Sequence, residues 1–227
     1  MMNEVSAKTD ILAAIKTNLS ASRSFEPTHA EYASDPTEKA EKVAVGSNGR
    51  QTQQALADIF RDNLTAVGGK FTTVGGSENL AVALQSILDE LGARTIAISD
   101  SDTVGLAVRM VSTKAQILVQ ATAEELFGSD VGITEAQWAI AETGTLVLEG
   151  DKEASRLTSL VPGTHICILH VANIRPTMSA ILQILESSLS PVVTFITGPS
   201  RTSDIELTLA LGIHGPRSVY VIVVDDA

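Results

Sequence analysis

Two kinds of hydrophobic spacing alternate along the chain from residue 50 onward. Apolar residues three and four positions apart predict helices. The first of these helices ends at 68–69, and the others cover 77–92, 102–111, 123–128, 176–189 and 204–212. Short apolar runs between them predict strands at 70–74, 94–99, 115–121, 145–150, 164–171, 191–197 and 218–224. We expect Ser77 to cap its helix and 191–197 to be a fully buried strand. The alternation predicts an α/β fold with a mainly parallel sheet and helices on both faces.

The first 49 residues have a different pattern. Residues 7–20 have the spacing of an amphipathic helix, whereas residues 21–49 are polar, contain Pro27 and Pro36, and show no sustained period. We therefore expect two parts, which are an N-terminal helix with an extended polar arm at 1–49 and a folded domain at 50–227.

Composition narrows the classes of function. The chain has 16 basic and 27 acidic residues, a net charge of −11, and no Lys/Arg cluster, which disfavours nucleic acid as a partner. No apolar run approaches the ~20 residues of a membrane span. The N-terminus lacks the basic and apolar regions of a signal peptide, so we expect a cytoplasmic protein.

Cysteine and histidine usage bears on cofactors. The single cysteine, Cys167, excludes an intramolecular disulfide and an iron–sulfur cluster held by this chain alone. It lies in an alternating apolar run, which indicates a buried thiol. The four histidines are scattered and form no pair four residues apart, so we expect no metal site.

The stretch "AIAETGTLVL" carries the first candidate chemistry. Glu142 stands in an apolar surround just before Thr143, Gly144 and Thr145. Because an unpaired buried carboxylate is costly, Glu142 should pair with a cation, reach solvent or have a raised pKa. A raised pKa would make it a general base or nucleophile. The alternative interpretation is a hairpin turn with an exposed glutamate.

The stretch "FITGPSRTSDIE" contains the second group of candidate functional residues. Gly198 permits a close turn, Ser200 or Thr202 is placed to cap a following helix, and the Arg201 guanidinium matches a carboxylate or phosphate. Asp204 would lie in the first turn of that helix, where negative charge is favoured. These features predict an anion-binding loop. The alternative is purely local capping and pairing, with Arg201 bonded to Asp204 or Glu206.

A third polar stretch forms the predicted turn directly before the last strand. His214 lies between Gly212 and Gly215 and comes before Arg217. A neutral imidazole there has the pKa range of an acid or base near pH 7. We expect this turn and the two preceding stretches to share one crevice of positive potential.

Four segments together resemble the LUD domain family: "GITEAQWAIAETGTLVLEG", "RLTSLVPGTHICILH", "IRPTMSAIL" and "FITGPSRTSDIELTLALGIHGPRSVYVIVV". The resemblance implies the fold of the NagB/RpiA/CoA-transferase superfamily for residues 50–227. It also implies a role in oxidising L-lactate to pyruvate, beside two iron–sulfur partner proteins that carry the clusters. The positions that match the family's motifs are Glu142, Thr143, Gly144, Gly198, Ser200, Arg201, Thr202, Asp204, His214, Gly215 and Arg217.

Three functions remain open at this point. The first is a subunit without clusters in a lactate-oxidising system, with a pocket for a small carboxylate or phosphate. The second is a stand-alone isomerase or CoA-transferase that uses Glu142. The third is an assembly protein that holds the iron–sulfur partners through its N-terminal arm.

Overall fold

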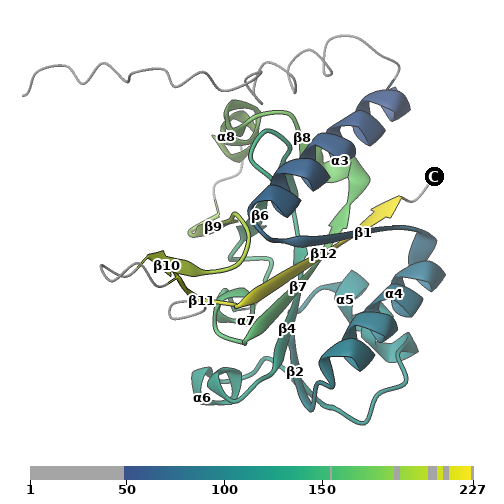
Figure 1. The fold of residues 1–227 in the computed structure, drawn as a ribbon, viewed down its shortest axis with the longest axis vertical. Helices are drawn as coiled ribbons and strands as arrows, with labels where there is room; N and C mark the ends of the chain where they lie inside the picture. The colour runs from purple at the N-terminus through teal and green to yellow at the C-terminus, as the bar shows by residue number, and fades with distance from the viewer. Residues whose placement is uncertain (1–48, 154, 187–189, 204–208, 212–214, 226–227) are drawn as a thin grey trace, which may run out of the picture. The chain divides into compact units, whose positions relative to one another are not determined.

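The structure is a computed structural model that describes residues 49–153, 155–186, 190–203, 209–211 and 215–225 (Figure 1). The predicted helix at 7–20 and most of the polar arm lie outside these residues, as do Asp204 and His214.

Five of the described helices form where the apolar spacing predicts them, and a sixth, Leu157–Leu160, was not predicted. They are α3 (Gly49–Ala66), α4 (Gly76–Leu91), α5 (Asp102–Met110), α6 (Ala123–Phe127), α7 (Leu157–Leu160) and α8 (Met178–Glu186), with a 3-10 turn η1 (Val171–Asn173). Gly92 ends α4 in the left-handed conformation with φ 59°, which glycine adopts without strain. The predicted cap at Ser77 is wrong, because α4 begins at Gly76 and the cap position lies two residues earlier, at Gly75.

Six strands form a sheet in which every pair is parallel, which confirms the predicted fold class. Its spatial order is β1 (Lys70–Gly75), β12 (Ser218–Asp225), β7 (Thr164–His170), β4 (Val131–Ala136), β2 (Thr95–Ile98) and β3 (Gln116–Val119). The carboxyl ends of all six strands therefore lie along one edge and their amino ends along the other.

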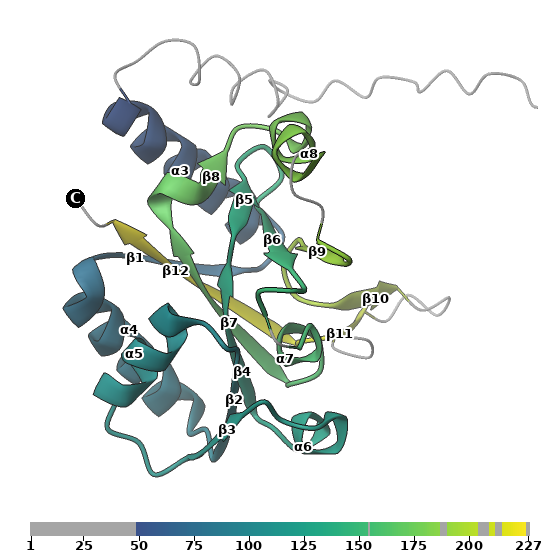
Figure 2. The same cartoon turned by 180° about the vertical axis from the view of Figure 1, so that it is seen from behind.

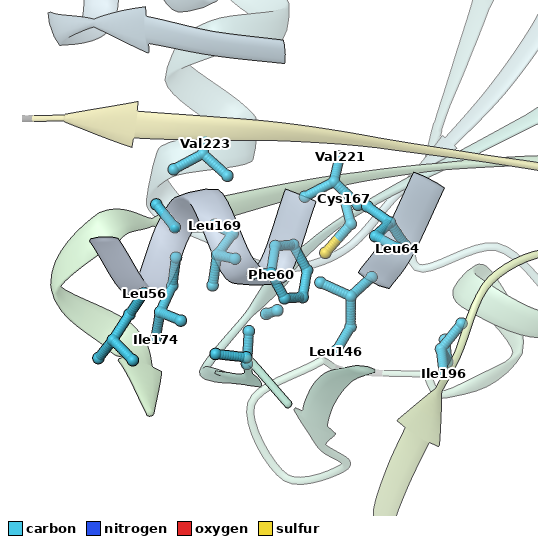
Figure 3. Packing of buried hydrophobic residues seen from close by; sticks show 14 of the residues in the cluster. Leu56, Phe60, Leu64, Leu146, Cys167, Leu169, Ile174, Ile196, Val221 and Val223 are labelled. Carbon is cyan, nitrogen blue, oxygen red and sulfur yellow. The ribbon is translucent and has the colours of Figure 1, made fainter. Parts of the chain in front are cut away.

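Alternate residues of the central strands face opposite sides of this sheet, and both sides are buried by other elements. On β12, Val221 packs with α3, whereas Tyr220 and Ile222 pack with α4 and α5 (Figure 1). Phe60 of α3 is fully buried in the first layer, close to Cys167 (Figure 3). The buried thiol agrees with the sequence, and burial raises the pKa of Cys167.

A second sheet packs beneath α3 and is covered by α8 (Figure 2). Its order is β8 (Ile174–Arg175), β5 (Trp138–Ile140), β6 (Thr145–Glu149) and β9 (Val193–Ile196). The prediction of a fully buried strand at 191–197 is wrong, since β9 is an edge strand, runs antiparallel to β6, and leaves Phe195 40% exposed.

The prediction of a helix at 204–212 is wrong where the structure describes it. Leu209–Leu211 is a strand, β11, which pairs antiparallel with β10 (Arg201–Ser203). The chain after Gly198 therefore continues into a strand, and no helix starts at Ser200 or Thr202 to be capped. Within the described residues, none of the helices combines the length and the apolar character needed to cross a membrane.

Candidate functional site

The last turns of α3 hold the two stretches that the sequence singles out. Asn63 donates through Nδ2 to the carbonyl oxygens of Ala141 (2.8 Å) and Glu142 (3.0 Å). Gly144 lies against the Leu64 backbone with φ 65°, and an added Cβ would lie 2.3 Å from the Leu64 nitrogen. The glycine of the "ETGT" motif is therefore required by both conformation and close packing.

The other stretch contacts α3 just beyond that point. Arg201 donates through Nη2 to the carbonyl oxygen of Val67 at 2.6 Å. Gly198 has φ 80°, and a Cβ there would come within 2.8 Å of the Val67 side chain. The guanidinium predicted to bind an anion thus holds its loop to the end of α3.

A chain of hydroxyl groups joins the two stretches directly. Thr143 Oγ1 and Thr145 Oγ1 are 2.7 Å apart, and Thr145 Oγ1 and Thr197 Oγ1 are also 2.7 Å apart. The two stretches are therefore neighbours in space, although 52 positions separate Thr145 from Thr197. The crevice of positive potential that the sequence predicts between them stays a prediction.

Glu142 has a local partner. Its Oε1 accepts the backbone N–H of Met178, the first residue of α8, at 2.7 Å. This half-buried carboxylate thereby satisfies one of the free N–H groups at the start of that helix. A role for Glu142 as base or nucleophile would therefore fall to its other oxygen, Oε2.

Gly215 and Arg217 line a cavity of about 660 Å³ at the amino ends of the parallel strands. The loop reaches this position because the Ser200 nitrogen donates to Pro216 and the Arg217 nitrogen donates to Gly163. Arg94, which directly precedes β2, lines the same cavity. The two arginines are 123 positions apart in the sequence, and they line the same cavity because β12 and β2 run in the same direction.

Both guanidiniums of this amino-end cavity are exposed and have no partner among the described residues. The nearby carboxylate of Asp130 is already engaged, because its Oδ2 accepts the backbone N–H groups of Arg94 (2.8 Å) and Thr95 (3.0 Å). The described lining of the cavity therefore contains two unpaired guanidinium groups and one hydrogen-bonded carboxylate.

A different cavity, of about 430 Å³, opens at the carboxyl ends of β2 and β4. Glu135 is its central group: it accepts a short hydrogen bond from Ser101 Oγ, and its Oε1 lies 3.4 Å from Nε2 of His170. Burial raises the pKa of Glu135, but hydrogen bonds from His170, Ser101 and Thr103 outweigh it, so the pKa lies below its usual value. Glu135 is therefore ionised at neutral pH.

The other charged and aromatic groups near this carboxyl-end cavity bond to one another. Lys152 Nζ lies 3.0 Å from Glu149 Oε1, and the same oxygen accepts Nε1 of Trp138 at 3.2 Å. The Arg175 guanidinium stacks on the Trp138 ring at 4.7 Å. The cations on this side are thus already paired.

Glu153 is buried behind the lining residue Gln137, with 1% of its surface exposed. Its Oε1 accepts from Gln137 Nε2 at 3.4 Å, and its Oε2 has no partner among the described residues. Burial, to which the charge of Glu135 adds, raises the pKa of Glu153 to about 7, although the Gln137 hydrogen bond opposes the shift.

The sequence analysis selects Gly215 and Arg217 of the amino-end cavity but not the other residues that matter here, which are Arg94, Ser101, Glu135, Trp138, Lys152 and, next to Glu135, His170. A usable signal was present, since "SDSD" directly follows a strand and Glu135 and His170 stand at strand ends. Of the predicted residues, Asp204 and His214 lie outside the described residues, as does the side chain of Thr202. Within the described part of the chain, His, Cys, Asp and Glu form no group of three or more that suits a metal ion.

Comparison with known proteins identifies the family of the chain. A protein from Halalkalibacterium halodurans named lactate utilization protein C is 31% identical over 162 residues, which cover 65% of this chain and 70% of that protein. Its namesake from Macrococcus caseolyticus is 30% identical over 186 residues, covering 77% and 80%. The crystal structure of a DUF162 family protein from Deinococcus radiodurans matches the fold with a TM-score of 0.59 at 23% identity, over 76% of this chain and 98% of that one. The sequence model of the LUD domain matches residues 57–224, and the chain belongs to the LUD domain family.

Proposed function

We propose that this chain is a subunit, without iron–sulfur clusters of its own, of a system that oxidises L-lactate to pyruvate. The names of its relatives support a role in lactate utilization. The single Cys167 cannot supply the four thiolates that an iron–sulfur cluster usually takes, and it is buried. Electron-carrying clusters would then belong to two iron–sulfur partner proteins.

The observation that carries the proposed ligand site is the pair of free guanidiniums in the amino-end cavity. An arginine fork matches the two oxygens of a carboxylate, so Arg94 and Arg217 each offer a site that suits the carboxylate of lactate or pyruvate. Among the described residues, the charged side chains that line the cavity are these two guanidiniums and the single carboxylate of Asp130, so positive charge predominates there. In a chain of net charge −11, such a locally positive cavity is where a small anion is most favoured.

Arg201 takes a different role in this proposal. Its bond to Val67 holds the loop of Gly198 against the end of α3, and this loop in turn supports the turn at 215–217 through the bond from the Ser200 nitrogen to the Pro216 carbonyl oxygen. Arg201 would thus position the lining of the amino-end cavity without contacting the carboxylate.

Calorimetry with L-lactate, pyruvate and phosphate tests this placement. Arg217→Ala and Arg94→Ala should each weaken binding about tenfold, which is the effect of one charge-assisted hydrogen-bonded pair. Arg109→Ala removes an exposed arginine at the end of α5 and should bind as wild type does. Loss of binding in Arg201→Ala alone would instead place the anion at the loop beside Val67. Equal binding by the wild type, Arg94→Ala and Arg217→Ala would refute the amino-end cavity.

A further inference from the structure

The carboxyl-end cavity differs from the amino-end cavity in the sign of its charge. Glu135 and Asp102 contribute two carboxylates to its lining, and Lys152 contributes the one cation. Because Lys152 is paired with Glu149, its charge does not balance theirs. A small anion would be repelled here, so the cavity is unsuited to the carboxylate proposed for the opposite edge of the sheet.

The hydrogen-bonding groups of this cavity point to the same conclusion. The amide of Gln137 is fully used, since Nε2 donates to the Glu135 carbonyl and to Glu153 while Oε1 accepts the Glu149 nitrogen. Lys152 gives one of its three N–H donors to Glu149, and Asn173 adds an amide to the lining. Within the described lining, the charged groups that lack a balancing cation are the carboxylates of Glu135 and Asp102, and the latter is exposed and accepts no hydrogen bond from the groups described above.

An aromatic wall completes the lining. Trp138 presents an apolar surface beside these acceptors, and Arg175 and Glu149 fix its orientation. A ring next to carboxylate acceptors suits a ligand that has hydrocarbon surface and carries donor groups.

We propose that the carboxyl-end cavity binds a non-anionic ligand that carries hydroxyl or ammonium groups, with Glu135 and Asp102 accepting its hydrogen bonds. Ser101, Thr103 and His170 hold the Glu135 carboxylate in place and ionised, so the acceptor is preorganised before the ligand enters. This site is separate from the lactate pocket, and its test does not depend on the proposed role in lactate oxidation.

Trp138 makes the proposal measurable, because it is the only tryptophan in the chain. Its fluorescence should change saturably when Tris, a small ammonium compound with three hydroxyl groups, is added to protein in HEPES buffer. Glycerol, which has hydroxyl groups without the charge, should produce the same change at higher concentration. Phosphate should produce none.

Two variants locate the effect. Glu135→Gln and Asp102→Asn should each raise the Tris concentration for half-maximal change about tenfold, the loss expected for one charge-assisted hydrogen bond. Asp102 is exposed at the start of α5, so its variant keeps the Ser101–Glu135 bond and tests the site even if Glu135→Gln fails to fold. Glu124→Gln, an exposed carboxylate of α6, is the matched control and should respond as wild type does. The absence of any saturable change with Tris, an equal response to phosphate, or wild-type titration by both variants would overturn the proposal.

Discussion

Replacing Gly144 with alanine should lower the free energy of unfolding by about 3–5 kcal/mol. Two costs combine: the left-handed φ of 65° disfavours any residue with a Cβ, and the new methyl group would lie 2.3 Å from the Leu64 nitrogen. The obstructing atoms are helix backbone, so α3 and the turn must separate. That movement would strain the bonds from Asn63 to Ala141 and Glu142 and loosen Phe60 in its buried layer.

Urea unfolding of the wild type and of Gly105→Ala provides the comparison. Gly105 lies within α5, and a Cβ there would meet no atom within 4 Å. Its replacement should therefore raise stability by about 1 kcal/mol, the difference in helix propensity between glycine and alanine. A Gly144→Ala protein that unfolds within 1 kcal/mol of wild type, with an unchanged slope, would show that α3 does not pack on this turn.

Glu153→Gln should stabilise the protein by about 3 kcal/mol at pH 8 and change its stability little at pH 4.5. The pKa of Glu153 is about 7 in the folded protein and 4.5 for an ordinary glutamate, so the folded state holds this proton more tightly. Its contribution to stability is fully present below pH 4.5 and is lost as the pH rises to about 7. Glutamine stays neutral throughout and keeps the hydrogen bond from Gln137.

Another buried group opposes this trend in the wild type. Burial lowers the pKa of His165 from 6.5 to about 4, and its Nε2 lies 2.8 Å from Thr134 Oγ1. Its contribution is present above pH 6.5 and is lost as the pH falls toward 4. The two effects nearly cancel between pH 4.5 and 6.5, so the informative quantity is the difference between Glu153→Gln and the wild type at each pH.

Unfolding curves at several pH values measure that difference directly. It should grow from near zero at pH 4.5 to its full size above pH 7. Glu124→Gln, at an exposed position, should show no such growth. A Glu153→Gln difference that is constant with pH would mean that the pKa of Glu153 is the same in the folded and unfolded protein, and that burial does not raise it.

The parallel sheet was predictable because its signal is local. The segments that become β7 and β12 are apolar on both faces, which occurs when helices cover both sides. The edge strand β9 has an equally apolar sequence, yet it belongs to the other sheet and leaves Phe195 exposed. Periodicity reports which side chains avoid water, but it does not report which strand pairs with which.

The two cavities were harder to predict because their residues meet through topology. Arg94 and Arg217 stand next to different strands and line one cavity only because β12, β7, β4 and β2 are neighbours in that order. Glu135 and His170 likewise end adjacent strands. In contrast, the neighbouring positions of Thr145 and Thr197 could be anticipated, since both stretches carry a density of polar groups that a simple turn does not need.

The central claim is that this chain acts in L-lactate oxidation through the arginines of its amino-end cavity. The most direct test is the rate at which L-lactate reduces an artificial electron acceptor in a mixture of this chain with its two proposed iron–sulfur partners. We predict that the rate requires this chain and falls at least about tenfold when the Arg94→Ala, Arg217→Ala double variant replaces it. An unchanged rate with the double variant, or without this chain at all, would contradict the account.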